Sequence, residues 1–205
     1  MIKPISILLR TAAVLCAAFF MAGCRAQNPA ASAAAPAEKP AVVPGAPTAV
    51  TAQANSVFRV KAGLSAPFTD SEGRVWQPDQ GFDGGDTTDR DASTAIAGAK
   101  DPALFLSEHY GMNSFSCKIP NGKYTAKLYF AETFDGITGP GQRVFSFDVQ
   151  GHEFKDFDVW AKAGGSNRAY IEAVPVEITN GIFRIDFTTN IENPEINAIE
   201  IIPQP

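Results

Sequence analysis

The sequence predicts an all-β fold, an antiparallel β-sandwich of jelly-roll-like type that forms a single domain over residues 56–205. Apolar and polar side chains alternate with a period of two in residues 124–130, 145–149 and 183–187. Turn signals separate these stretches, and no window carries a helical apolar stripe longer than two or three turns. Short alternating stretches between turns are typical of half-buried strands packed into two sheets.

The most regular of these stretches ends at Phe130 and places four apolar side chains on one face: Tyr124, Ala126, Leu128 and Phe130. Successive side chains of a strand point to opposite faces, so we expect Thr125, Lys127 and Tyr129 on the other side. The stretch begins after a turn signal, Asn121-Gly122, and the same dipeptide recurs at Asn180-Gly181. Both Asn-Gly pairs predict β-hairpins, because both residues tolerate positive φ.

The first 24 residues resemble a bacterial lipoprotein signal. Lys3 and Arg10 precede an apolar run, residues 11–21, that is too short to span a bilayer. The run ends in Met21-Ala22-Gly23-Cys24, which is similar to a lipobox, so Cys24 is the predicted lipidation site. The alternative is ordinary secretory cleavage a few residues later, with Cys24 discarded.

Residues 25–55 are rich in Ala and Pro and carry few large apolar side chains, which predicts a disordered linker. Signal and linker together predict an exported protein of the cell envelope, tethered to a membrane by an N-terminal lipid. Arg25 stands where an inner-membrane retention signal would place Asp, which favours the outer membrane if the cell has two membranes.

Composition excludes several functional classes. The net charge is −5 and no Lys/Arg cluster is present, so no nucleic-acid partner is expected. Cys117 is the lone Cys of the folded part, which excludes an intrachain disulfide there; we interpret it as a small core residue rather than a reactive thiol. His109 and His152 are the only histidines, and neither lies near a nucleophile elbow, so we expect no zinc site and no serine-type triad. Acids are plentiful enough for the two facing carboxylates of a glycosidase, but no motif points to such a pair, so we expect no enzymatic activity, no metal and no cofactor.

One acidic segment leaves an alternative open. Residues 83–91 contain four Asp, and acidic loops can bind Ca²⁺ through oxygen ligands. The spacing lacks the Gly and the terminal Glu of an EF-hand loop. A solvated polar loop is therefore the favoured interpretation of this segment.

Six ordered fragments resemble the malectin family, a group of non-catalytic sugar-binding β-sandwich domains. They are 58–63 (Phe-Arg-Val-Lys-Ala-Gly), 68–76 (ending in Gly-Arg-Val-Trp), 81–85 (Gly-Phe-Asp-Gly-Gly), 107–111 (Ser-Glu-His-Tyr-Gly), 129–149 (Tyr-Phe-Ala-Glu, then Gly-Gln-Arg-Val-Phe) and 192–201 (ending in Asn-Pro-Glu-Ile-Asn-Ala-Ile-Glu-Ile). The resemblance covers nearly all of the folded part. It implies a malectin-like or galactose-binding-like sandwich with a carbohydrate site on loops at one end.

The resemblance also implies the site residues, which are three aromatics and two acids: Phe82, Tyr110, Phe134, Asp135 and Glu192. An aromatic ring packs on the C–H face of a pyranose, and a carboxylate accepts hydrogen bonds from its hydroxyls. The alternative is that these aromatics belong to the core. Glu132 ends a strand beside the site, and a structural ion pair with Arg143 is expected for it.

The function implied is therefore non-catalytic binding of an oligosaccharide or glycan, glucose-containing or other, by a membrane-tethered domain. The alternative is a structural or protein-interaction module of the cell envelope without sugar affinity. It is favoured by Phe82 and Phe134, because the best-known family members have Tyr at both positions and an aromatic where this chain has Asp135.

Overall fold

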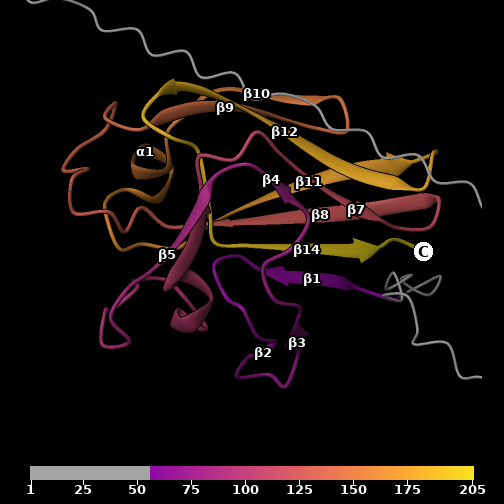
Figure 1. The fold of residues 1–205 in the computed structure, drawn as a ribbon, viewed down its shortest axis with the longest axis horizontal. Helices are drawn as coiled ribbons and strands as arrows, with labels where there is room; N and C mark the ends of the chain where they lie inside the picture. Colours follow the sequence, from indigo (N-terminus) through magenta and orange to yellow (C-terminus); the bar gives the residue numbers. More distant parts are fainter. Residues whose placement is uncertain (1–55) are drawn as a thin grey trace, which may run out of the picture. The chain divides into compact units, whose positions relative to one another are not determined.

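Two antiparallel sheets form the body of the domain in the computed structural model, which describes residues 56–205 (Figure 1). The first sheet has the strand order β1-β14-β8-β11 and the second the order β10-β9-β12-β7-β4. The strands of the first sheet are β1 (Phe58–Lys61), β14 (Ala198–Pro203), β8 (Gly122–Phe130) and β11 (Tyr170–Ile178). Those of the second are β10 (His152–Phe157), β9 (Val144–Val149), β12 (Ile182–Ile191), β7 (Ser114–Lys118) and β4 (Phe82–Asp83).

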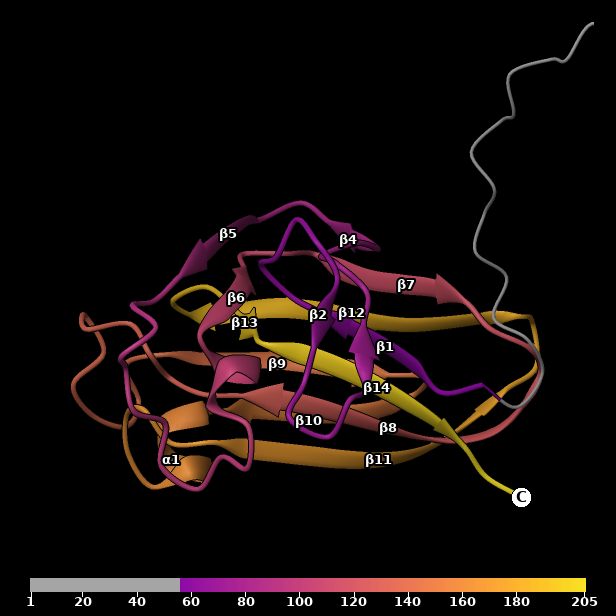
Figure 2. The same cartoon turned by 90° about the horizontal axis from the view of Figure 1, so that it is seen from below.

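Smaller elements are added to this sandwich. A three-stranded sheet has the order β13-β6-β5, with β13 (Glu195–Ile196), β6 (Ser107–Tyr110) and β5 (Asp86–Asp89). The remaining elements are β2 (Phe68–Thr69), its partner β3 (Val75–Trp76), the 3₁₀ helix η1 (Pro102–Phe105) and the helix α1 (Val159–Ala163). Figures 1 and 2 both place α1 and β5 toward the end of the sandwich that lies away from the C-terminus. The predicted fold class, a single antiparallel β-sandwich domain, is confirmed.

The core follows the predicted alternation. Tyr124, Ala126, Leu128 and Phe130 of β8 are all at most 4% exposed and belong to the main apolar cluster between the sheets. Tyr129 is the exception, since it was expected on the outer face and is also buried. Its ring lies edge-on to that of Trp76, with centroids 5.4 Å apart, in a second apolar cluster. This second cluster covers the outer side of β8 near the strand's end.

The two Asn-Gly hairpin predictions are wrong. Each dipeptide makes a turn, but the strands it joins, β7 with β8 and β11 with β12, belong to different sheets. The two turns instead bond to each other: the Asn121 side chain accepts from Gly181 N at 2.7 Å and donates to Thr179 O at 3.0 Å. A consecutive-strand hairpin does occur at β9–β10, across Gln150 and Gly151, which both have positive φ.

Cys117 on β7 is half-buried and packs against the main cluster. Burial raises the pKa of its thiol to about 12, so the reactive thiolate is disfavoured at neutral pH. The acidic segment also differs from expectation, because part of it is the strand β5 rather than a loop. Residues 56–205 hold no group of three or more His, Cys, Asp or Glu side chains placed to bind a metal ion.

Buried polar side chains fix the small sheet to the sandwich. Asn197 accepts from Ala131 N at 2.7 Å and donates to Ser107 O at 2.9 Å, which ties the start of β14 to the end of β8 and to β6. Lys61 is fully buried and donates to Ser107 O and to Asn197 O, at 2.7 and 3.0 Å. Burial lowers the pKa of Lys61 to about 7, although Glu108, Asp79 and Glu195 act to raise it. β6, which carries two residues of the site below, is therefore rigidly placed.

Candidate functional site

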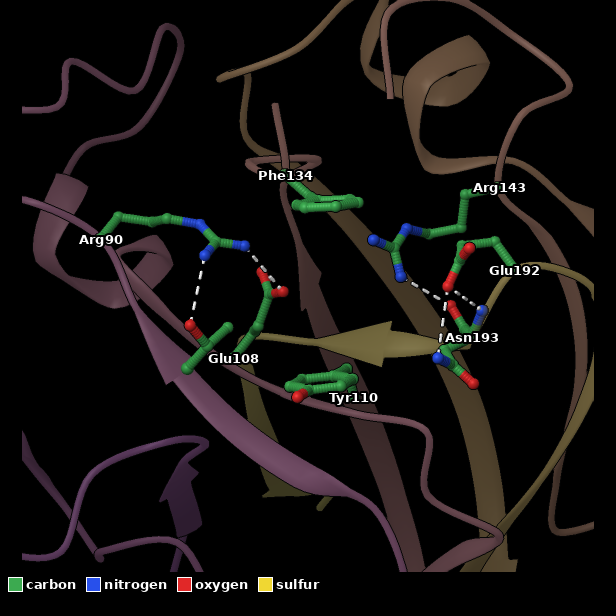
Figure 3. Close-up of a pocket in the computed structure, with 8 residues that line it drawn as sticks. Arg90, Glu108, Tyr110, Phe134, Arg143, Glu192 and Asn193 are labelled. Atoms are coloured by element: carbon green, nitrogen blue, oxygen red, sulfur yellow. Dashed lines mark hydrogen bonds and ion pairs between the residues drawn. The ribbon is translucent and has the colours of Figure 1, made fainter. Parts of the chain in front are cut away.

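An open pocket of about 230 Å³ lies where the small sheet meets the loops of the sandwich (Figure 3). β5 and β6 supply three of its lining residues, the loop after β5 supplies Arg90, and the loops after β8 and β12 supply the other four. They are Thr88, Arg90, Glu108, Tyr110, Phe134, Arg143, Glu192 and Asn193.

Two aromatic rings form opposite sides of this pocket, with Phe134 facing Tyr110 across it (Figure 3). Tyr110 ends β6, where its backbone pairs with both neighbouring strands of the small sheet. Phe134 is 46% exposed, which is unusual for so apolar a side chain. Its ring packs against Gly136, where an added Cβ would lie 2.5 Å from Phe134 Cε1. The absence of a side chain at position 136 therefore leaves room for the ring in this position.

The first charged group of the pocket is the pair Arg90–Glu108. Glu108 is buried, and its Oε1 accepts from Arg90 Nη2 at 3.0 Å. Its Oε2 accepts from Thr133 Oγ1 at 3.0 Å, and that hydroxyl in turn accepts from Arg90 Nε at 3.0 Å. The hydrogen bonds hold the carboxylate and the guanidinium in fixed positions, which is the preorganisation that recognition of a polar ligand needs.

The second charged group lies on the other side, around Arg143 (Figure 3). Arg143 Nε donates to Glu132 Oε2 at 2.7 Å, which confirms the expected structural pair, and Nη1 donates to Asn193 O at 2.7 Å. Burial raises the pKa of Glu132, with Arg143 opposing it. Burial acts to lower the pKa of Arg143, but Glu195 and Glu132 outweigh it and the pKa is raised. The guanidinium thus stays charged at the rim of the pocket.

Glu195 is a fully buried acid close to this pocket. Neither carboxyl oxygen has a hydrogen-bond partner within the described part of the chain. Burial raises its pKa well above 4.5, and Glu108 and Glu132 raise it further. Its carboxyl group is therefore held in the neutral form over a wider pH range than an exposed acid.

Three of the five predicted site residues come together in this pocket: Tyr110, Phe134 and Glu192. Glu192 has a left-handed backbone, with φ of 62°, and its Oε1 accepts from Asn193 N at 3.1 Å. Asp135 lines a neighbouring pocket instead. Phe82 lines neither pocket, because its ring stacks on His109 with centroids 4.2 Å apart and packs against the core.

Sequence reasoning missed five lining residues: Thr88, Arg90, Glu108, Arg143 and Asn193. Glu108 could have been found, because it stands two residues before Tyr110 on one strand and so shares its face. Arg90 and Arg143 reach the pocket from loops, and no local spacing in the sequence indicates that they line it.

An antiparallel sandwich with a preformed pocket of aromatic and charged side chains at one end defines a ligand-binding β-sandwich module. Such a pocket offers apolar faces for packing and fixed polar groups for orientation. The sequence profile of the malectin domain matches residues 56–199, and the chain belongs to this family of non-catalytic carbohydrate-binding domains.

The chain spans less than half the length of each of the three similar proteins that follow. A β-glucuronidase of Bacteroides uniformis superposes with a TM-score of 0.65 at 21% identity, over 73% of this chain and 18% of the enzyme. The extracellular domain of ANXUR1 from Arabidopsis thaliana gives 0.63 at 17%, over 72% of this chain and 48% of that one. A probable leucine-rich repeat receptor-like serine/threonine-protein kinase of Arabidopsis thaliana is 36% identical over 72 residues, 33% of this chain and 7% of the kinase. These structural likenesses show the fold.

Proposed function

We propose that this protein is a membrane-tethered carbohydrate-binding protein that recognises a glucose-containing or other oligosaccharide and cleaves nothing. The observation that carries the proposal is the pocket between Tyr110 and Phe134, where rings on two sides are combined with fixed charged groups. The apolar C–H face of a pyranose can pack on either ring. Its hydroxyls can donate to Glu108 and Glu192 and accept from the two guanidiniums.

The arrangement of the acids supports binding over hydrolysis. A glycosidase needs one carboxylic acid to protonate the leaving oxygen and a second carboxylate as base or nucleophile. In the pocket, Glu108 is held by Arg90, and Glu192 is bonded to the backbone and side chain of Asn193. These carboxylates are oriented acceptors, a role that suits recognition.

The test is a glycan array probed with residues 25–205, which lack the signal and the lipidation site Cys24, followed by calorimetric titration of the best glycan. Tyr110→Ala should weaken binding about tenfold, as loss of a desolvated aromatic contact does. Ile171→Ala is the matched control, since Ile171 is an exposed apolar residue of β11 that does not line the pocket. Equal affinities for both variants would place the binding site elsewhere.

A second candidate is a structural or protein-interaction module of the cell envelope without sugar affinity. Phe134 favours it, because an exposed ring without a hydroxyl suits an apolar protein contact as well as a sugar. A folded domain that binds no glycan on the array would support this candidate.

The tether is the second part of the proposal and rests on Cys24, which lies outside the described residues. The lipobox-like end of the signal supports acylation of Cys24, and Arg25 supports outer-membrane residence if two membranes are present. Cys24→Ser should release the protein from membranes or block its processing, as measured by fractionation and by mass spectrometry of the mature N-terminus. An unmodified N-terminus beyond residue 24 would contradict the tether.

A further inference from the structure

A second pocket, of about 250 Å³, shares the Phe134 side chain with the first. It lies between the loop that follows β8 and the segment formed by α1 and the residues after it. Its lining residues are Thr133, Phe134, Asp135, Ile137, Thr138, Trp160, Ser166 and Asn167. Phe134 is the one residue common to the linings of both pockets, so the two pockets adjoin at this residue.

Trp160 supplies the second pocket with a large aromatic side chain on a fixed support. It lies in α1, whose N-cap Asp158 accepts from Ala161 N at 3.0 Å and from Gly141 N at 2.6 Å. Gly164 ends the helix in a left-handed conformation and donates its N–H to Trp160 O at 2.9 Å. The helix is thus bonded at both ends, and Trp160 is held between them in a partly exposed position.

Asn167 supplies an unused acceptor. Its backbone is held in the left-handed region, with φ of 50°, by bonds from its N–H to Glu132 O and from Ala97 N to its carbonyl, both 2.8 Å long. Its side-chain Oδ1 is buried, and no donor within residues 56–205 bonds to it. A buried acceptor without a partner is unfavourable, so a turn of the Asn167 amide toward the pocket, where a ligand hydroxyl can donate to it, would be accompanied by a gain. Asp135 provides a further, exposed carboxylate in the same pocket.

We propose that the pocket between Phe134, Trp160 and Asn167 is a second sugar subsite, so that the domain binds a longer oligosaccharide across Phe134. The inference rests on the proposed function. The first sugar units of the oligosaccharide occupy the pocket at Tyr110, and the following units occupy the second pocket. Trp160 stacks on a pyranose face, and the exposed Asp135 accepts from the sugar hydroxyls. Asn167 Oδ1 also accepts once its amide turns toward the pocket. The ligand class is an oligosaccharide of more than two units.

The experiment compares the binding of oligosaccharides of different lengths to residues 25–205, which lack the lipidation site Cys24. Glucose oligomers of two linkages serve as probes: maltose to maltohexaose and cellobiose to cellohexaose. Calorimetry gives the affinity at each length, and we expect it to rise about tenfold beyond the disaccharide in the series that binds. Trp160 is also an optical reporter, because the only other Trp, Trp76, is fully buried. Longer oligomers should reduce acrylamide quenching of Trp160 fluorescence, and disaccharides should not.

Variants separate the two pockets. Trp160→Ala should abolish the gain with length and leave the affinity for the disaccharide within about twofold, whereas Tyr110→Ala weakens every length. Lys162→Ala, on the same helix, is the matched control and should keep the full length dependence. Asp135→Ala, at an exposed loop position, should reduce the gain about threefold and covers the case that Trp160→Ala fails to fold.

The outcomes distinguish the two proposals. Binding of a disaccharide with no gain in affinity at greater length, and no protection of Trp160, would overturn the second subsite and leave the proposed function standing. No binding of any glycan, either on the array or in these titrations, would overturn both.

Discussion

Truncation of Phe134 is the substitution whose effect on binding can be worked out most fully. A Phe side chain offers about 150–250 Å² for burial, and 46% of Phe134 is exposed. A sugar that covers it would therefore bury about 70–115 Å² of apolar surface, worth up to about 2–3 kcal/mol at about 25 cal/mol per Å². Because coverage is incomplete in real complexes, we expect Phe134→Ala to cost about 1–3 kcal/mol of binding free energy, or about 5- to 150-fold in Kd.

The effect on folding should be smaller, because nearly half of the ring is already in water. Phe130 provides the contrast, since it is fully buried and Phe130→Ala should cost about 3–5 kcal/mol of unfolding free energy. Phe134→Ala should cost less than half of that. Calorimetry gives the affinity of each variant for the best array glycan, and urea titration gives the stability. A Phe134→Ala variant that is strongly destabilised but binds with unchanged affinity would refute a role of the ring in recognition.

Three further predictions concern the loop, the buried acid and the fold. Gly136→Ala should weaken glycan binding about tenfold, because its Cβ would displace the Phe134 ring. Gly139→Ala is the control and should bind normally, because a Cβ there would have no neighbouring atom within 4 Å. Equal Kd values for the two variants would contradict the prediction. Glu195→Gln should gain stability relative to the wild type as pH rises above 4.5, by at most about 1.4 kcal/mol per pH unit. The reason is that the folded chain, with the raised pKa, keeps a proton that the unfolded chain releases, so wild-type stability declines as pH rises through the folded pKa. Parallel urea-midpoint profiles of the two proteins would rule this out. Thermal unfolding should be cooperative and insensitive to reductant, since Cys117 is the sole Cys in residues 56–205. It should also be insensitive to EDTA, since the same residues hold no group of side chains placed to bind a metal ion. A midpoint lowered by EDTA would revive a calcium site.

The alternation of β8 and the sandwich class were predictable, because burial on one face imposes a period of two on any strand. The sequence did not allow us to predict which strands pair with each other. An Asn-Gly pair sets the geometry of a turn, but the turns at Asn121 and Asn180 lead into the opposite sheet. The burial of Tyr129 on the outer face of β8 likewise depends on Trp76, a residue far away in the sequence.

The site was predictable only in part, even within the recognisable fragments, since Glu108, Arg143 and Asn193 lie in them and were not named. Tyr110, Phe134 and Glu192 were named from the family resemblance and line one pocket. Arg90 and Arg143 could not be named as lining residues, since their positions depend on buried bonds to Glu108 and Glu132 that form only in the tertiary structure. The tertiary structure is therefore needed to show that Arg90 holds Glu108 in the pocket and that Arg143 lines it.

The central claim, that a glycan binds between Tyr110 and Phe134, is tested most directly by mapping backbone amide shifts by NMR. Isotope-labelled residues 25–205, without the lipidation site Cys24, are titrated with the best array glycan. The account predicts that the largest shifts fall on Tyr110, Phe134 and Asn193, and that residues of the far turns at Asn121 and Asn180 are unaffected. Shifts that cluster elsewhere on the sandwich, with these three amides unchanged, would contradict it.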